Sequence, residues 1–175
     1  MPAALGASEA VGSSGFTPLD PAYAARVRDS FERQAAMRLI GAALIRVSPG
    51  QADIHLPFRS DLTQQHGFIH GGIIGMIADS ASGYAGYTLM PADTSVLTVE
   101  YKINLLSPAQ GTALIARGRV IKPGRTLVIT QCEVVAVQGG AEKQCAVMQQ
   151  TLMVMHGRDD HAETGGSQTQ SQTAR

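Results

Sequence analysis

Apolar residues recur at every fourth position near the start of the chain, which is close to the period of a helix. They run from Tyr23 to Ala35 and follow directly on the pair Asp20-Pro21. Aspartate is favoured as the residue that caps a helix, and proline is favoured at its first position. The pattern therefore predicts an N-terminal helix that begins at this pair and buries one apolar stripe.

The longest apolar run, "GGIIGMIADSASGYAGYTLM", predicts a second and longer helix over 72–89, with Pro91 just beyond its end. Two short strands are expected before it, at 39–47 and 52–58, around the turn "SPGQ". The run is long enough to be considered as a membrane span. Its glycines, its hydroxyl side chains and Asp79 argue against that reading, so we expect a buried helix of a folded domain.

After the long helix the pattern changes to period two, which is typical of strands. In the first such segment, 95–106, the apolar residues from Leu97 to Leu105 are expected on one face and the polar residues from Thr98 to Asn104 on the other.

Three further strands are expected at 112–121, 126–137 and 143–155, with hairpin turns at "KPGR" and "QGGA". The order of elements is helix, two strands, long helix, then four strands in a meander. This order predicts an α+β fold with one antiparallel sheet and its helices collected on one face.

Composition places one domain between two tails. The chain has 175 residues, 44% of them hydrophobic, and a formal net charge of zero, without a basic block that would favour nucleic acid or an anionic membrane surface. Residues 1–16 are small and polar and carry no secretion signal, while 157–175 are rich in Gly, Ser, Gln and Thr. We expect flexible tails on either side of a domain over 17–156.

Cysteine usage adds an expectation about the compartment. Cys132 and Cys145 are too few for a disulfide framework. We interpret them as core residues of a reduced, cytoplasmic protein, with a pairing between them left open.

Asp79 is the one charged residue between Gly71 and Met90. An unpaired carboxylate is costly to bury, and no basic residue stands three or four positions away to pair with it. Gly71 and Gly72 begin the helix, where free N–H groups and the helix dipole favour negative charge. This end is a candidate oxyanion hole, and Asp79 is either a catalytic carboxylate or a structurally paired acid.

The stretch "HGGIIGMIADSASGYA" resembles the signature of the hotdog-fold acyl-CoA thioesterases, in particular their PaaI-like (phenylacetate-pathway) branch. That signature is His-Gly-Gly, six residues, Asp and then small residues. "NLLSPAQG" and "PGRTL" are also similar to that family, and the resemblance spans roughly 39–155. It implies a curved antiparallel sheet wrapped around the long helix, and no cofactor. It also implies dimers that join their sheets, commonly paired into homotetramers, with active sites at the dimer interface.

The resemblance also assigns residue roles. The N–H of the second glycine, Gly72, would polarise the thioester carbonyl, and Asp79 would act as general base or nucleophile. Thr98 would orient water from the following strand. Gln64 stands where relatives usually carry an asparagine that assists at the carbonyl.

The histidines before the helix leave alternatives open. His70 would either orient the carbonyl or hydrogen-bond the backbone where the helix begins, and we favour the second role. His66 and His70 are four residues apart, like metal ligands on a helix. Gly67 between them indicates a loop, so we expect no metal.

Substrate contacts are expected from Gly71 and from the "KPGR" turn. Arg125 and Lys122 would meet the phosphates of coenzyme A, because arginine suits phosphate geometry. An ordinary solvated hairpin turn explains the same two residues equally well. The methionine-rich end "MQQTLMVM" is interpreted as core packing rather than as an adaptable acyl pocket.

Three functions follow from these patterns. The first is an acyl-CoA thioesterase, acting as a cytoplasmic homo-oligomer without nucleic-acid or membrane partners. The second is a hydratase or dehydratase of acyl thioesters, whose His/Asp or His/Glu motifs are not found in this chain. The third is a non-catalytic acyl-CoA binding protein, against which the presence of Asp79 argues.

Overall fold

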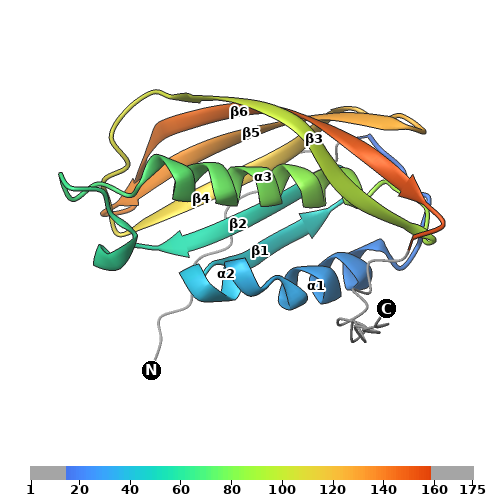
Figure 1. The fold of residues 1–175 in the computed structure, drawn as a ribbon, viewed down its shortest axis with the longest axis horizontal. Coiled ribbons are helices and arrows are strands. Elements are labelled where there is room, and N and C mark those ends of the chain that lie inside the picture. The colour runs from blue at the N-terminus through green and yellow to red at the C-terminus, as the bar shows by residue number, and fades with distance from the viewer. Residues whose placement is uncertain (1–14, 159–175) are drawn as a thin grey trace, which may run out of the picture.

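The fold described by the computed structural model, over residues 15–158, is a six-stranded antiparallel sheet curved around one long helix (Figure 1). The long helix, α3 (Gly71–Tyr87), lies in the hollow of the sheet. The strands are β1 (Ala43–Ser48), β2 (Gln51–Pro57), β3 (Thr94–Leu105), β4 (Ala113–Lys122), β5 (Leu127–Gln138) and β6 (Ala141–His156). The hotdog architecture expected from the sequence is confirmed.

The N-terminal helix is shorter than expected, and it is followed by a second one. Helix α1 spans Tyr23–Arg33 and α2 spans Ala35–Ile40. The prediction that α1 begins at Asp20-Pro21 is wrong, because these residues form a turn in which the Asp20 carboxylate accepts from the Ala22 N–H at 2.8 Å. Likewise, the residues expected to open the first strand complete α2, which ends at Gly41 with φ 75°.

The predicted meander of four strands is also wrong. The strand order is β1-β2-β4-β5-β6-β3, so β4, β5 and β6 follow one another but β3 pairs with β6 at the sheet edge. The chain therefore crosses from one edge of the sheet into its middle after β3. Alternation along a strand tells which face is buried, but not which strand lies beside it.

A bulge in β3 changes which residues face the helix. Thr98 pairs with Leu152 and Glu100 with Thr151, so Val99 is an extra residue on this strand. The single apolar face expected from Leu97 to Leu105 is therefore wrong, because the inward row switches at the bulge. Thr98 faces α3 before it, and Tyr101 faces α3 after it, where its hydroxyl lies 3.9 Å from the position of a Cβ on Gly75.

Glycines let α3 lie close to the strands. A Cβ on Gly118 of β4 would stand 2.2 Å from the Ala81 carbonyl oxygen, and one on Gly86 would stand 2.5 Å from Leu152 Cδ1. Both contacts are closer than packed atoms allow. Small residues at these contacts therefore allow α3 to pack closely in the hollow of the sheet.

Helix α1 closes the far end of α3. The Arg26 guanidinium donates to the carbonyls of Met90 at 2.7 Å and Pro91 at 2.6 Å, and it stacks 4.2 Å from the Tyr87 ring centroid. These carbonyls follow the helix and lack partners within it. This end of α3 is thus held by structural hydrogen bonds.

Two further expectations concern the ends of the chain and membranes. Phe16, within the tail expected at 1–16, is partly buried and packs against the core. Residues 1–14 and 159–175, most of both expected tails, lie outside the described residues. None of the helices formed by residues 15–158 is long and apolar enough to cross a membrane.

Candidate active site

The start of α3 is capped by a side chain. His70 has the extended backbone of a capping residue (φ −61°, ψ 139°), and its Nδ1 accepts from the Gly72 N–H at 2.9 Å. The backbone role favoured for His70 is therefore present in the structure. Because Nδ1 accepts a hydrogen bond, a neutral His70 carries its proton on Nε2.

This cap changes which N–H group is available at the helix start. The Gly72 N–H, expected to be the oxyanion donor, is already bound to His70. Within residues 15–158, the preceding Gly71 N–H donates to no other group. The first N–H groups of a helix have no partner within the helix. Gly71 therefore offers a free donor at this end, whereas the Gly72 N–H, expected in that role, is occupied by His70.

The loop before α3 positions Gln64 near that donor. Its backbone N–H donates to the Phe68 carbonyl at 2.8 Å, and the loop turns at Gly67 with φ 80°. The Gln64 side-chain oxygen accepts from the His66 N–H. This bond orients the amide so that its nitrogen remains free among the described residues.

A pocket of about 460 Å³ opens beside the helix start. It lies between the loop, the first turns of α3 and the segment after β3. Its lining residues are Gln64, Phe68, Ile69, Gly71, Ile74, Leu105, Leu106, Ser107, Pro108 and Ala109. Gly71 and Gln64 both line this pocket and Gly72 does not, so the free N–H and the amide border the same apolar space.

Asp79 lies further along α3, in a closed network with two strands. The Thr98 hydroxyl donates to Asp79 Oδ1 at 2.8 Å. The Gln150 Nε2 donates to the same Oδ1 and, at 2.8 Å, to Thr98 Oγ1. Among the described residues Oδ2 has no hydrogen bond. The carboxylate is thus fixed through one oxygen and leaves the other free.

Gln150 is a site residue that the sequence analysis did not identify. It comes from β6 and is only 1% exposed. The stretch around it was interpreted as core packing, which is correct for Met148 and Leu152 on the same inward row. A single amide between two buried apolar residues at period two was the available signal.

The two halves of the site are far apart in one chain. Gly71 and Asp79 are eight positions apart, which is about 12 Å at the rise of an α-helix. In thioester hydrolysis the oxyanion donor lies about 3 Å from the carbonyl oxygen, and the attacking water lies about 3 Å from the carbonyl carbon. The structure therefore brings Asp79, Thr98 and Gln150 together, and Gly71 and Gln64 together, but not the two groups with one another.

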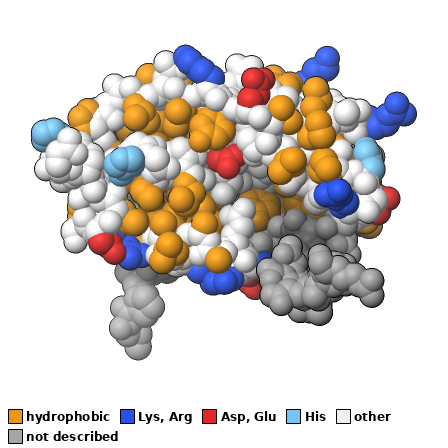
Figure 2. All heavy atoms as spheres, viewed as in Figure 1, with side chains coloured by type: hydrophobic (Ala, Val, Ile, Leu, Met, Phe, Trp, Pro, Cys, Tyr) orange, Lys and Arg blue, Asp and Glu red, His pale blue; other side chains and the backbone are white. Residues whose placement is uncertain are grey.

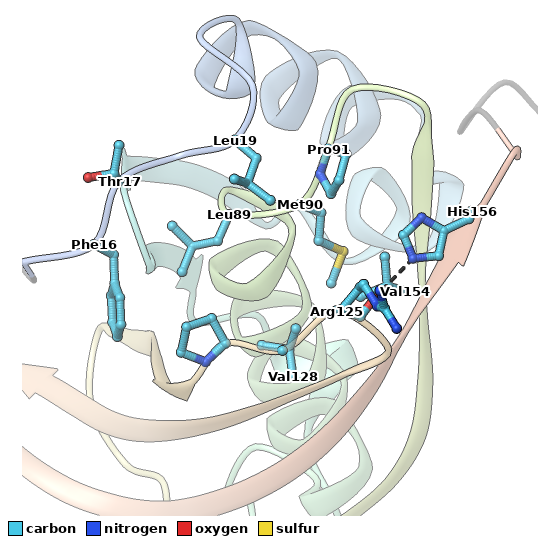
Figure 3. A pocket seen from close by; sticks show the side chains of 12 residues that line it. Phe16, Thr17, Leu19, Leu89, Met90, Pro91, Arg125, Val128, Val154 and His156 are labelled. Atoms are coloured by element: carbon cyan, nitrogen blue, oxygen red, sulfur yellow. Dashed lines mark hydrogen bonds between the residues drawn. The ribbon is translucent and has the colours of Figure 1, made fainter.

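The two basic residues of the "KPGR" turn lie elsewhere. Arg125 borders a second pocket, of about 430 Å³, beyond the C-terminal end of α3 (Figure 3). Leu89 and Met90 line it from the helix end, and the His156 ring bonds to the Arg125 carbonyl at 3.0 Å. Lys122 is exposed at the end of β4. Within one chain, neither basic residue joins Asp79.

The cysteines and histidines form no competing centre among residues 15–158. Cys132 and Cys145 are free and buried, and burial raises the pKa of Cys132 to about 12 and that of Cys145 to about 11. Thiols with such a pKa are poor nucleophiles at neutral pH. No three His, Cys, Asp or Glu side chains in this part of the chain gather as metal ligands do.

A family model described as "Thioesterase superfamily" matches residues 66–143. A Saccharolobus solfataricus protein, named as a candidate esterase, is 30% identical over 96 residues, covering 55% of this chain and 68% of its own. A Listeria monocytogenes protein named 1,4-dihydroxy-2-naphthoyl-CoA hydrolase is 24% identical, covering 66% of this chain and 91% of its own.

Solved structures agree with these matches. A thioesterase family protein from Silicibacter pomeroyi is 45% identical with a TM-score of 0.76, covering 77% of this chain and 99% of its own. The E. coli PaaI protein from the phenylacetic acid degradation operon is 20% identical with a TM-score of 0.70, covering 79% and 97%. At that identity the second likeness concerns the fold alone.

Proposed function

Because this chain belongs to the thioesterase superfamily and is a thioester hydrolase, we propose that it hydrolyses acyl-CoA to a carboxylic acid and coenzyme A. The observation that carries this proposal is the state of Asp79. Its Oδ1 is held by Thr98 and Gln150, and its Oδ2 is free. A carboxylate fixed in this way is suited to act as general base or as nucleophile.

The oxyanion donor in this proposal is the Gly71 N–H, in place of Gly72. The Gly71 N–H is free and borders the apolar pocket, whereas the Gly72 N–H is bound to His70. The free amide nitrogen of Gln64, on the same pocket wall, is the second donor to the carbonyl oxygen. His70 supports both by holding the helix start.

The reaction then proceeds through a tetrahedral intermediate. As general base, Asp79 Oδ2 takes a proton from water while the water oxygen attacks the thioester carbonyl carbon. Gly71 and Gln64 stabilise the negative charge that develops on the carbonyl oxygen. The carbon–sulfur bond breaks, and the thiolate takes the proton back from Asp79. Direct attack by Oδ2, with an anhydride intermediate, uses the same oxygen and remains the alternative route.

The site we propose is shared between two chains. The roughly 12 Å between Gly71 and Asp79 along one helix exceeds the span of a single thioester. Both residues lie on the side of α3 that faces β3, since a Cβ on Gly71 would stand 2.9 Å from Leu105 Cδ1 and Asp79 bonds to Thr98. A partner with its α3 antiparallel would bring its own Asp79 to this chain's Gly71.

The surface of the chain supports such a pairing. β3 is an edge strand with unpaired backbone groups on one side, and Leu97 and Val99 on it are 57% and 52% exposed. Figure 2 shows hydrophobic side chains spread over the face on which α3 and β3 lie, with most charged side chains near its outline. Long apolar edges are ready to pair with another strand. Pairing of such dimers into tetramers stays a prediction.

The test of the activity is a panel of acyl-CoA esters with aryl, short and medium acyl groups, followed by thiol release. We expect stoichiometric release of coenzyme A and free acid from at least one ester. Binding without release would favour the acyl-CoA binding protein. Consumption of an enoyl ester without thiol release would favour the hydratase.

The test of the shared site is a mixed dimer. Asp79→Asn and Gly71→Pro chains, each with a different affinity tag, are co-expressed, and dimers carrying both tags are isolated. In a mixed dimer one site carries both changes and the other neither, so activity should return to about half that of the wild type per dimer. Each homodimer is expected to be nearly inactive. A mixed dimer as inactive as its parents would show that each site lies within one chain.

A further inference from the structure

We propose that Gln150 is a positioning residue that holds the Asp79 carboxylate in place and aims its free oxygen at the substrate. The inference rests on the proposed function of Asp79 as base or nucleophile. Gln150 contacts neither the pocket nor the helix start, so it acts on the reaction only through Asp79. No feature of the family signature quoted above includes this position.

The hydrogen-bond network fixes which end of the amide meets the carboxylate. An ionised carboxylate only accepts hydrogen bonds, so the Gln150 NH2 group must face Asp79 Oδ1. The same NH2 group donates to Thr98 Oγ1 at 2.8 Å, which frees the Thr98 hydroxyl hydrogen for Asp79. Two donors therefore converge on one carboxylate oxygen and hold it from two sides.

The other end of the amide shows what this arrangement costs. The Gln150 Oε1 atom is buried and has no hydrogen-bond partner within residues 15–158. A buried polar atom without a partner destabilises the fold. An apolar residue of similar size would avoid that cost at a position that is 1% exposed. The hydrogen bond that the amide nitrogen donates to Asp79 therefore explains why glutamine occupies this position.

No charged side chain of the described residues replaces Gln150 in this task. Asp79 forms no salt bridge among them. Tyr101 on β3 and Cys132 on β5 are titratable side chains that face α3, and Cys145 on β6 is buried in the same core. None of the three bonds to Asp79. The charged side chains of the neighbouring strands form hydrogen bonds with groups other than Asp79. These pairs are Glu100 with Thr151, Lys102 with Asn104, Arg117 with Glu142, and Arg119 with Asp53.

The position of both donors also sets the direction of the carboxylate. Thr98 and Gln150 occupy Oδ1 from β3 and β6, the two strands paired at this edge of the sheet. Oδ2 is thereby directed away from the strands. Removal of Gln150 leaves a single donor, about which the carboxylate can rotate.

The decisive variant is Gln150→Glu, which keeps the size of the side chain and places a carboxylate against Asp79. Two carboxyl groups in contact hold one proton between them more tightly than either does alone. We expect the acid limb of kcat against pH to move upward by about one pH unit or more. The matched control is Gln149→Glu, which adds the same charge one residue away on the exposed face of β6; its acid limb should stay near that of the wild type.

A second variant covers the case in which Gln150→Glu does not fold. Gln150→Met keeps the bulk and removes the donor, so kcat should fall by about tenfold, the value of one hydrogen bond to a charged group, while KM changes little. Gln150 would be a packing residue if the acid limb of kcat against pH were the same in the two glutamate variants. It would also be one if Gln150→Met changed the melting temperature but left kcat unchanged. Full activity of Asp79→Asn would instead refute the proposed function, so the two failures are distinguishable.

Discussion

Asp79→Asn is expected to lower turnover of acyl-CoA by roughly 10²–10⁴-fold, the range that loss of a general base or nucleophile produces. Asparagine keeps the size of the side chain, and its carbonyl oxygen can still accept from Thr98 and Gln150. The network around position 79 should therefore survive, and only the basic oxygen is lost. The measurement is steady-state thiol release on the ester that the panel identifies as best.

The melting temperature of Asp79→Asn tests the same hypothesis independently of activity. The Asp79 carboxylate is half-buried and has no cationic partner among the described residues. Taking such a charge out of water costs stability, and sites kept for function commonly carry costs of this kind. We expect the melting temperature of Asp79→Asn to stay the same or to rise. If Asp79→Asn turns over acyl-CoA at the normal rate, or if its melting temperature falls while its activity remains, Asp79 is a structural acid.

Gly71→Pro should lower turnover by roughly 10²–10³-fold relative to Gly71→Ala, the range for loss of one oxyanion donor. Proline removes the N–H group without interrupting the helix, because it is favoured at the first position of a helix. His70, the residue before it, already has the extended backbone (ψ 139°) that a following proline requires. Both variants also add a Cβ 2.9 Å from Leu105 Cδ1, so the steric disturbance is common to both.

The alanine variant is what makes this comparison decisive. It carries the same contact with Leu105 but retains the N–H. Any activity lost in alanine therefore measures packing, and any further loss in proline measures the replacement of the N–H donor by the proline ring. Circular dichroism and gel filtration on both variants check that helix and oligomer are intact. Equal turnover in the two variants would remove Gly71 from the reaction and return the donor role to Gly72.

Some features of this protein are determined by local properties of its sequence. The period of the apolar residues predicted α3 within two residues at each end, and the hairpins at "KPGR" and "QGGA" were placed by turn chemistry. Asp79 could be identified as a candidate site residue because burying one charge in an apolar run costs stability. Its neighbour Thr98 came from the resemblance, and the structure brings the two within hydrogen-bonding distance.

Other features depend on contacts between segments far apart in the chain. The sequence pattern could not show that β3 pairs with β6, and it could not show the bulge at Val99 that turns both Thr98 and Tyr101 toward α3. Gln150 joins Asp79 across 71 positions of sequence. The His70 ring occupies the Gly72 N–H only because the backbone folds back on itself at the helix start.

The division has a physical reason. Helix period, turn residues and the cost of a lone charge are properties of a few neighbouring residues, so the sequence alone determines them. Strand order, register and the occupancy of a donor or acceptor depend on which distant groups meet, and alternation of apolar residues is compatible with several such arrangements. For this chain, sequence alone located the helix and its carboxylate, while the tertiary structure decided which groups hold that carboxylate and which N–H remains free.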